Sequence, residues 1–320
     1  MVLETIFAVI ALISGIALLT YSSDKAVEHS VKVALEWGLS PFMVGLTLVS
    51  LGTDLPEIVN SIFSSGLGHG DINVGDSLGS VLTQMTLVLG LLPFLGRKFK
   101  VKRREVLIIG AYQVIALILA VSIAEKGYIT RINALFLVAI WPVFMLLTRS
   151  GVAKDAAEKE HPVERSDERH RRHFVIAALG FAGVGIGSFA VIESVITISE
   201  VFHVSEYLIS FFVVAIGTSL PELVVDLTAI RSKQYKLAVG DLIGSCIVDA
   251  SLAIGIGPLI FPVDVSGELV TITGLYAIFG SIIVLSTLAI RERVDKKTGA
   301  LFLVVYALSY TLLSCCPLFT

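Results

Sequence analysis

The 320-residue chain is 55% apolar and 16% charged, and its mean hydropathy of +0.87 is far above the value of a soluble domain of this length. This composition excludes a soluble protein and predicts a chain that crosses a lipid bilayer several times. The net charge of −3 says little by itself, and the sequence indicates neither a nucleic-acid partner nor an obligate protein partner. Its three cysteines, two of them adjacent, do not form a disulfide framework.

Ten stretches of the chain are apolar and long enough to be membrane helices, which need about 20 residues each. They are residues 4–33, 41–65, 72–95, 105–124, 130–148, 174–201, 206–230, 237–261, 268–290 and 298–317. No basic segment or small-residue cleavage site accompanies the first stretch. We therefore expect it to be a membrane span and not a removable signal peptide.

The basic residues predict the orientation of these spans. Twenty of the 24 lysines and arginines lie in the loops after spans 3, 5, 7 and 9, whereas the opposite loops hold Lys126 and Arg131. The positive-inside rule places the basic loops in the cytoplasm. We therefore expect an integral protein of the plasma membrane with both termini outside.

Two pairs of hexapeptides reveal an internal repeat. GTDLPE at 52–57 returns as GTSLPE at 217–222, and GDSLGS at 75–80 returns as GDLIGS at 240–245, both with an offset of 165 residues. Each copy holds five spans, and this odd number gives the two copies opposite orientations. The predicted fold is an all-α membrane protein of ten transmembrane helices in two inverted-topology five-helix repeats, which is a frequent basis of secondary transporters.

This repeat divides the chain into three parts. The first repeat covers 1–149, with its motif at 45–92, and the second covers 174–320, with its motif at 210–257. A hydrophilic segment at 150–173 is expected to be a cytoplasmic linker. Its histidines, His161, His170 and His173, match no familiar metal-ligand spacing, so a metal site there is not favoured.

Proline in each first hexapeptide predicts a break in a membrane helix. Pro56 and Pro221 have no N–H group and free the carbonyls near Gly52 and Gly217 from helical hydrogen bonds. Irregular backbone at membrane depth is tolerated where it lines a cavity, and free carbonyls there suit a cation. The sequence therefore predicts a cation site at both breaks.

Helical spacing places oxygen-bearing side chains on one face at each break. The side chains with i, i+3 or i, i+4 spacing are Thr53, Asp54 and Glu57 in the first copy and Thr218, Ser219 and Glu222 in the second. A second polar stripe comprises Asp76, Ser80 and Gln84 in the first copy and Asp241, Ser245 and Asp249 in the second. For Asp76 and Asp241 two interpretations stay open, a ligand role and a helix cap or cavity wall.

Carboxylates, hydroxyls and carbonyls without clustered histidine or cysteine favour a hard cation, and Ca²⁺ fits better than Mg²⁺, which requires a stricter octahedron. The chain has no phosphate-binding loop and no evident nucleophile and base pair, so we expect neither an enzyme nor a cofactor. Transport would then be driven by the gradient of another ion.

These motifs resemble the sodium/calcium exchanger family of the cation/calcium exchanger superfamily, and the resemblance covers essentially the whole chain. It implies that Glu57 and Glu222 are the central carboxylate ligands. It also implies oxygen ligands from Thr53, Thr218, Ser219, Ser80, Ser245 and Asp249, and from the backbone carbonyls near Ser50 and Ala215. Spans 1 and 6, which carry Glu28 and Glu193, would be the elements that slide.

Several residues depart from the pattern of that family. Asp54 replaces a usual serine and Gln84 a usual asparagine or aspartate, whereas Asp76 and Asp241 stand where asparagine is frequent. Asp226, one turn beyond Glu222, is a further acid. The expected function is therefore exchange of Ca²⁺ for Na⁺ by alternating access, with Ca²⁺/H⁺ antiport as the alternative. A cation channel is a more distant alternative.

Overall fold

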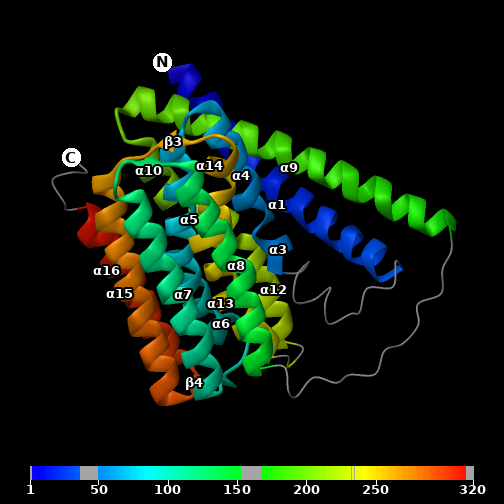
Figure 1. Ribbon diagram of the computed structural model, residues 1–320, viewed down its shortest axis with the longest axis vertical. Coiled ribbons are helices and arrows are strands. Elements are labelled where there is room, and N and C mark those ends of the chain that lie inside the picture. The colour runs from blue at the N-terminus through cyan, green and yellow to red at the C-terminus, as the bar shows by residue number, and fades with distance from the viewer. Residues whose placement is uncertain (1, 37–49, 153–166, 232, 234, 315–320) are drawn as a thin grey trace.

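Figure 1 shows the computed structural model, which describes residues 2–36, 50–152, 167–231, 233 and 235–314. Apart from four short β-strands it is helical. The elements of the first half are α1 (Val2–Glu36), α3 (Ser50–Thr53), α4 (Leu55–Leu67), α5 (Gly70–Leu82), the π-helical η2 (Thr83–Val88), α6 (Leu89–Leu95), β1 (Phe99–Lys100), α7 (Arg103–Ala124), β2 (Tyr128–Ile129) and α8 (Arg131–Val152).

The second half repeats this order and has in addition two elements at 206–214, α10 and η4, whose counterpart positions 41–49 lie outside the described residues. It comprises α9 (Asp167–Phe202), α10 (Glu206–Ile209), the π-helical η4 (Ser210–Val214), α11 (Ala215–Thr218), α12 (Leu220–Arg231), α13 (Tyr235–Val248), the π-helical η5 (Asp249–Ala253), α14 (Ile254–Ile260), β3 (Val263–Asp264), α15 (Gly267–Arg291), β4 (Arg293–Val294) and α16 (Lys296–Ser314). The linker expected at 150–173 is helical at both described ends, because α8 continues to Val152 and α9 begins at Asp167. Residues 153–166 lie outside the described part.

Seven helical segments of the described residues are long and apolar enough to cross a membrane. They are Glu4–Ser30, Gly70–Leu95, Arg103–Ala124, Arg172–Phe202, Glu206–Arg231, Ala238–Ile260 and Gly267–Arg291. A further apolar helix, Arg131–Phe144, is shorter. Of the ten expected spans, the second begins among residues outside the described part, and the last ends there. The protein is thus a mainly helical membrane protein.

Helices α1 and α9 pack against each other along their length and lie at one side of the bundle formed by the other helices (Figure 1). Glycines make this close contact possible. A Cβ atom on Gly180 would lie 2.6 Å from the Ala26 nitrogen, and one on Gly187 would lie 2.9 Å from the Leu19 nitrogen. Such approaches of small residues are typical of membrane helix pairs.

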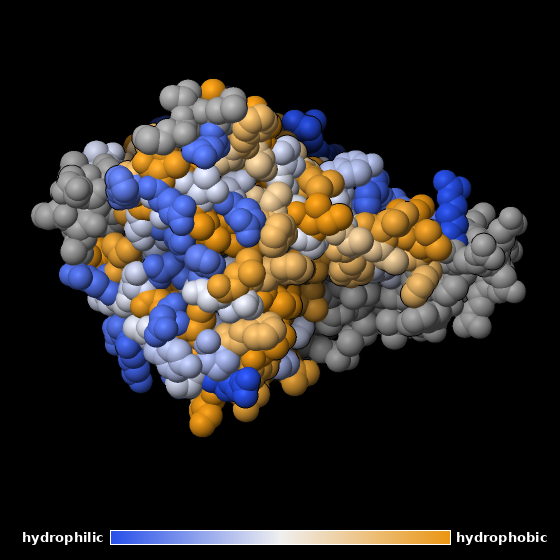
Figure 2. Space-filling view, turned by 90° about the horizontal axis from the view of Figure 1, so that it is seen from above, coloured by the Kyte–Doolittle hydropathy of each residue, from blue (hydrophilic) through white to orange (hydrophobic). Residues whose placement is uncertain are grey.

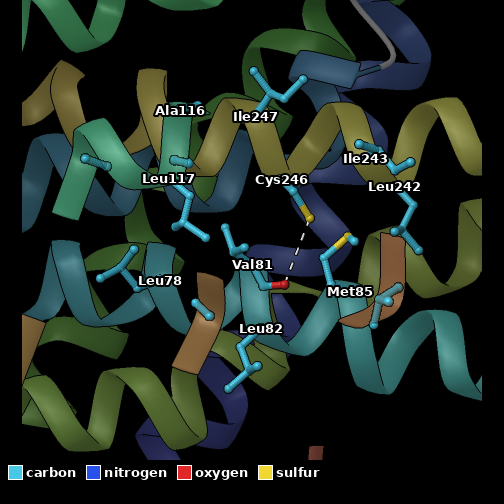
Figure 3. Packing of buried hydrophobic residues seen from close by; sticks show 14 of the residues in the cluster. Leu78, Val81, Leu82, Met85, Ala116, Leu117, Leu242, Ile243, Cys246 and Ile247 are labelled. Carbon is cyan, nitrogen blue, oxygen red and sulfur yellow. Dashed lines mark hydrogen bonds between the residues drawn. The ribbon is translucent and has the colours of Figure 1, made fainter. Parts of the chain in front are cut away.

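The outside of the bundle carries many large apolar side chains, among them Phe136 on α8, Phe279 on α15 and Ile290, which is 79% exposed. Figure 2 shows the end of the molecule that is at the top of Figure 1. Hydrophilic residues gather over one part of this end, and apolar residues lie beside them. The interior of the bundle is packed from both halves. In Figure 3, Val81 and Met85 face Cys246 across the centre, where the Cys246 thiol is 4.0 Å from the Val81 carbonyl oxygen.

Short strands join the two halves at both ends of the bundle. β1 pairs with β4 and β2 pairs with β3, both antiparallel. In Figure 1 the label of β3 is at the top and that of β4 at the bottom. β4 begins 165 residues after β2, and the positive-φ residues Gly127 and Glu292 are separated by the same offset. The two joints are therefore counterparts of one another.

Candidate functional site

Both prolines produce the expected helix breaks, and the breaks have the same geometry. Asp54 separates α3 from α4 with φ −84° and ψ 7°, and Ser219 separates α11 from α12 with φ −82° and ψ 4°. Pro56 and Pro221 are the second residues of the helices that follow. Asp54 and Ser219 are related by the repeat offset, so the sequence pattern and the backbone agree.

Helix α4 buries its polar face and exposes apolar side chains. Its buried residues are Pro56, Glu57, Asn60, Ser61, Ser64 and Ser65. Phe63 and Leu67, by contrast, are 38% and 45% exposed. This reverses the pattern of a helix on a soluble protein, and it is expected where lipid lies outside and a polar site lies inside.

Two hydroxyl pairs connect the halves across the centre of the molecule. Thr53 Oγ1 lies 3.3 Å from Ser245 Oγ, and Thr218 Oγ1 lies 3.3 Å from Ser80 Oγ. Under the 165-residue offset, Thr53 is the counterpart of Thr218 and Ser80 is the counterpart of Ser245. The sequence placed these four residues in the site, and the structure brings them together as two equivalent contacts.

Carboxylates on α4, α5 and η5 accept hydrogen bonds from neighbouring elements. Ser80 donates to Glu57 Oε1 at 3.4 Å, and Gln84 Nε2 donates to Asp249 Oδ2 at 3.1 Å. Gln84 lies in η2 and Asp249 begins η5, so the contact joins two π-helical segments. Such segments occur frequently at functional sites.

Asp76 receives two hydrogen bonds. Thr218 Oγ1 donates to Asp76 Oδ1 at 2.9 Å, and Asn60 Nδ2 donates to Asp76 Oδ2 at 2.6 Å. Sequence reasoning missed Asn60, although its position three residues after Glu57 places it on the same helical face. The helix-cap interpretation of Asp76 and Asp241 is wrong, since each is the seventh residue of its helix.

The remaining candidates are also in or beside these segments. Asp54, Glu222 and Asp226 are almost fully buried, and Asp241 is 7% exposed. The carbonyl of Ala215, at the start of α11, accepts the Ser219 hydroxyl at 2.7 Å. Ser50 is the first residue of α3.

Three other residues from the sequence analysis lie apart from these breaks. Glu28 pairs with Lys25 and Lys32 on its own helix, and Glu193 is exposed on α9. His173 lies against His29 of α1, with Nδ1 atoms 2.7 Å apart. The side chain of His170 and all of His161 fall outside what the structure describes.

The charge balance of the interior is one-sided. Seven carboxylates are buried in the described residues, and none of the buried residues there is a lysine or arginine. The seven are Asp54, Glu57, Asp76, Glu222, Asp226, Asp241 and Asp249. Nine of their oxygens accept no hydrogen bond of acceptable geometry from the described residues. Buried acceptors of this kind are costly unless a cation or a proton neutralises them.

These carboxylates do not form one preformed metal cage. Among the described residues no three histidine, cysteine, aspartate or glutamate side chains are close enough together to hold a metal ion. A cation bound here would therefore need hydroxyl and carbonyl oxygens besides at most two carboxylates, or a rearranged site. The threonine, serine and backbone oxygens at the two helix breaks can supply such ligands.

Comparisons with known proteins agree with this chemistry. Residues 7–149 and 172–314 match the family described as sodium/calcium exchanger protein. The putative antiporter CaxA of Alkalimonas amylolytica is 30% identical, with 82% of each chain covered. The sodium/calcium exchanger MaX1 of Methanosarcina acetivorans is 25% identical, over 92% of this chain and 95% of that one.

A solved structure resembles the whole fold. It is that of the sodium-calcium exchanger NCX_Mj soaked with Na⁺ and Sr²⁺, and it matches with a TM-score of 0.64 at 26% identity. The match covers 96% of this chain and 98% of that structure.

Proposed function

The chain belongs to the sodium/calcium exchanger protein family, and from this premise we propose that it exchanges Ca²⁺ for Na⁺ across the membrane by alternating access. It is a transporter and not an enzyme, and the family supports antiport of Ca²⁺ against another cation. The observation that carries the proposal is the interior with seven buried carboxylates and no buried lysine or arginine among the described residues. Such an interior attracts cations and repels anions.

The proposed ligands are the oxygens at the two helix breaks and in the stripes beside them. Glu57 and Glu222 are the central carboxylates, and Thr53, Thr218, Ser219, Ser80 and Ser245 supply hydroxyls. Asp249 contributes a third carboxylate after the site rearranges around the cation. Carbonyls near Ser50 and Ala215 complete the shell. Asp54, Asp76, Gln84, Asp226 and Asp241 surround these ligands and set the charge of the site.

In this mechanism Ca²⁺ and the counter-ions compete for the same carboxylates. Enclosing several unneutralised carboxylates in a low-dielectric interior costs much free energy. The site therefore changes its access from one side to the other only when bound cations have neutralised enough of its charge. This condition couples the two ion fluxes without any nucleotide.

We also propose that the fold is an inverted repeat of two five-helix units, 1–149 and 174–320. Four kinds of counterpart support this: the helix breaks, the hydroxyl pairs, the strand joints and the positive-φ residues, each related by an offset of 165 residues. The strand joints lie at opposite ends of the bundle in Figure 1, as opposite orientations require. Both termini are then outside the plasma membrane, and the linker is cytoplasmic.

Protons are a second candidate for the counter-ion. Asp54 occupies the position where the second repeat has Ser219, and Asp226 occupies the position where the first repeat has Ser61. At each of these two positions, one repeat carries an acid where the other carries a serine. A carboxylate that releases a proton when Ca²⁺ enters performs the same neutralisation as a bound Na⁺.

One experiment separates these two couplings. Purified protein in proteoliposomes is given ⁴⁵Ca²⁺ under an imposed Na⁺ gradient with the pH clamped, or under an imposed pH gradient without Na⁺. Uptake driven by the Na⁺ gradient alone supports Na⁺/Ca²⁺ exchange, and uptake driven by the pH gradient alone assigns the protein as a Ca²⁺/H⁺ antiporter. The absence of uptake under both gradients would refute Ca²⁺ antiport.

A further inference from the structure

The first helix contacts the freed backbone of the first break through a hydroxyl group. Ser23 Oγ on α1 donates to the carbonyl oxygen of Gly52 at 3.1 Å. This carbonyl has no helical partner because Pro56, four residues later, has no N–H group. Ser23 is almost fully buried, so its hydroxyl replaces the missing backbone donor.

The equivalent contact is absent in the second half. The repeat offset relates Ser23, Gly52 and Pro56 to Ser188, Gly217 and Pro221. Ser188 on α9 is 0% exposed, and its hydroxyl has no hydrogen-bond partner among the described residues.

Other hydroxyls on the same helix satisfy themselves locally. Ser194 donates to the Ala190 carbonyl at 2.6 Å, and Thr197 donates to the Glu193 carbonyl at 2.9 Å. The hydroxyl of Ser188 is therefore unpaired among the described residues, although it is buried where an unmade hydrogen bond is costly.

Helix α1 occupies the second break as well. A Cβ atom on Gly217 would lie 2.6 Å from Ile16 Cγ2, so the Ile16 side chain covers this glycine. The counterpart of Ile16 is Phe181 on α9, which is 48% exposed. Apart from their contact with each other, α1 contacts α3, α4, α11 and α12, whereas α9 packs mainly against α4.

The pair of long helices is nevertheless symmetric within itself. A Cβ atom on Gly15 would lie 3.2 Å from Val191 Cγ2, and one on Gly180 would lie 2.9 Å from Ala26 Cβ. These two contacts are counterparts under the repeat offset. The asymmetry therefore lies in how the pair is placed against the two breaks, and an equivalent placement with the roles of α1 and α9 exchanged is available to it.

We propose that Ser23 and Ser188 are positioning residues that bind the freed carbonyls of Gly52 and Gly217 alternately, one in each access state. This inference rests on the proposed antiport. In the state shown here, Ser23 holds the Gly52 carbonyl and Ile16 covers Gly217. In the opposite state, Ser188 holds the Gly217 carbonyl and Phe181 covers Gly52. Each hydroxyl stabilises one state by satisfying one freed carbonyl in that state.

The two serines should consequently have opposite effects. Ser23→Ala removes a hydrogen bond from the state shown here and should shift the ratio of the two states about fivefold towards the other one. Ser188→Ala should shift the ratio about as far in the reverse direction. A serine with a merely structural role would give changes of the same sign at both positions.

The test uses the full chain in nanodiscs and in proteoliposomes of sorted orientation. Hydrogen exchange of segments 50–57 and 215–222 is compared in wild type, Ser23→Ala and Ser188→Ala, and the half-saturating Ca²⁺ concentration is measured from each side. We expect Ser23→Ala to speed exchange at 50–57 and slow it at 215–222, with the reverse pattern in Ser188→Ala. The Ca²⁺ half-saturation on a given side should move in opposite directions in the two variants.

Two further variants serve as controls. Ser194→Ala removes a hydroxyl that bonds only within α9 and should change neither segment, and Ser23→Thr keeps the hydroxyl and should restore the wild-type pattern. Shifts of the same sign in both alanine variants, or no shift in either, would overturn the proposal. If wild type moves no Ca²⁺, the antiport fails instead, and the hydrogen-exchange comparison still decides the role of the serines.

Discussion

Gln84 donates its carboxamide to the carboxylate of Asp249 at 3.1 Å, and the two residues are each other's counterparts in the repeat. A contact between counterparts lies on the axis that relates the two halves. The thiol of Cys246, which also lies beside the Gln84 side chain, makes the same kind of contact with the carbonyl of Val81. At the centre of the site, residues at equivalent positions of the two halves therefore contact each other. At one such pair of positions the side chains are an amide in the first half and a carboxylate in the second.

This choice leads to the first prediction. Gln84→Asp replaces the amide donor with a second carboxylate facing Asp249, so the two like charges should lower the melting temperature in the absence of divalent ions. Added Ca²⁺ should raise the melting temperature more in this variant than in wild type, because it binds the folded form only. Thermal unfolding in detergent with and without Ca²⁺ measures both effects. Gln84→Asn, which keeps the amide, should resemble wild type; an equal Ca²⁺ response in all three proteins would place Gln84 outside the site.

A second prediction concerns the two central glutamates. Glu57→Gln and Glu222→Gln each remove a charge from a hard-cation shell and should lower ⁴⁵Ca²⁺ uptake at least about 100-fold, since losing one buried charged ligand costs about 3 kcal/mol or more. Both variants should still elute as folded protein by size-exclusion chromatography. Glu193→Gln, an exposed glutamate on α9, is the matched control and should transport normally. Full uptake in either site variant would remove the central claim.

The sequence predicted the parts of the site that depend on local spacing. The breaks at Asp54 and Ser219 follow from the prolines. Thr53 and Thr218 were expected beside the glutamates because they share a helical face with them, and Ser80 and Ser245 were expected on the second polar stripe, but the contacts between these hydroxyls were not predicted. Partners across the fold were not predictable in this way. Asn60 binds Asp76, a residue 16 positions away on another helix, and Ser23 binds a carbonyl 29 positions away. Such contacts depend on how the helices pack, which no periodicity encodes.

The helix-cap interpretation of Asp76 was wrong for a related reason. A helix start cannot be located from apolar sequence to within a few residues, and α5 begins at Gly70, six residues before Asp76. The repeat offset was a better guide than local signals, because it compares two copies of the same structure. It identifies Ser188 as the counterpart of Ser23 without any reference to helix ends.

A third prediction uses the caps of two equivalent helices. Asp295 Oδ1 accepts the backbone N–H of Thr298 at 2.9 Å at the start of α16, and Thr130 Oγ1 accepts that of Asn133 at 3.2 Å at the start of α8. Two hydrogen bonds hold the pKa of the Asp295 carboxyl below its ordinary value. The larger effect comes from the Thr298 backbone N–H and the smaller one from the Thr298 hydroxyl. The stability contributed by a carboxylate with a lowered pKa is present above its unfolded pKa and is lost as the pH falls through its folded pKa.

Asp295→Asn should therefore lower the melting temperature at neutral pH, and the difference from wild type should shrink as the pH falls through the lowered pKa of Asp295, below about pH 4. Thr130→Ala removes the equivalent cap without a titrating group, so its effect should not depend on pH. Melting curves in detergent from neutral to acidic pH compare the three proteins. A difference for Asp295→Asn that stays constant over this range would show that the charge of the cap does not matter.

The fourth prediction concerns orientation. The basic segments, with Arg97 and Lys98 before β1 and Lys296 and Lys297 at the start of α16, should be cytoplasmic together with the linker at 150–173. Single cysteines introduced in the linker, in a background with Cys246, Cys315 and Cys316 replaced, should react with an impermeant thiol reagent only after the cells are opened. A cysteine introduced beside Lys126, in a loop of the opposite side, should react in intact cells. Labelling of the linker from outside would reverse the orientation.

The last prediction rests on Asp54, where the two halves of the site differ. Both oxygens of this buried carboxylate lack a hydrogen bond of acceptable geometry from the described residues, and its counterpart Ser219 is neutral. Glu57 lies three residues further on and is also buried, so we expect the two carboxylates on the same side of the break. We expect Asp54 to carry a proton when no divalent ion is bound and to release it when Ca²⁺ enters, because either arrangement avoids two uncompensated buried charges. Lower pH should then weaken Ca²⁺ transport by competition.

Asp54→Ser makes the first break resemble the second and should remove this competition. Its Ca²⁺ half-saturation should change several-fold less than that of wild type between roughly pH 5.5 and 8.5, the range on either side of neutral in which a buried acid can titrate. Its transport should also depend more strongly on Na⁺, which would become the only counter-ion. Proteoliposome uptake over this pH range, with and without Na⁺, gives both readouts. Asp71→Asn serves as the control, because Asp71 accepts the Ser266 hydroxyl near the start of α5, at the end of this helix that lies away from the breaks. Identical pH and Na⁺ dependence in wild type and Asp54→Ser would mean that protons on Asp54 take no part in the exchange.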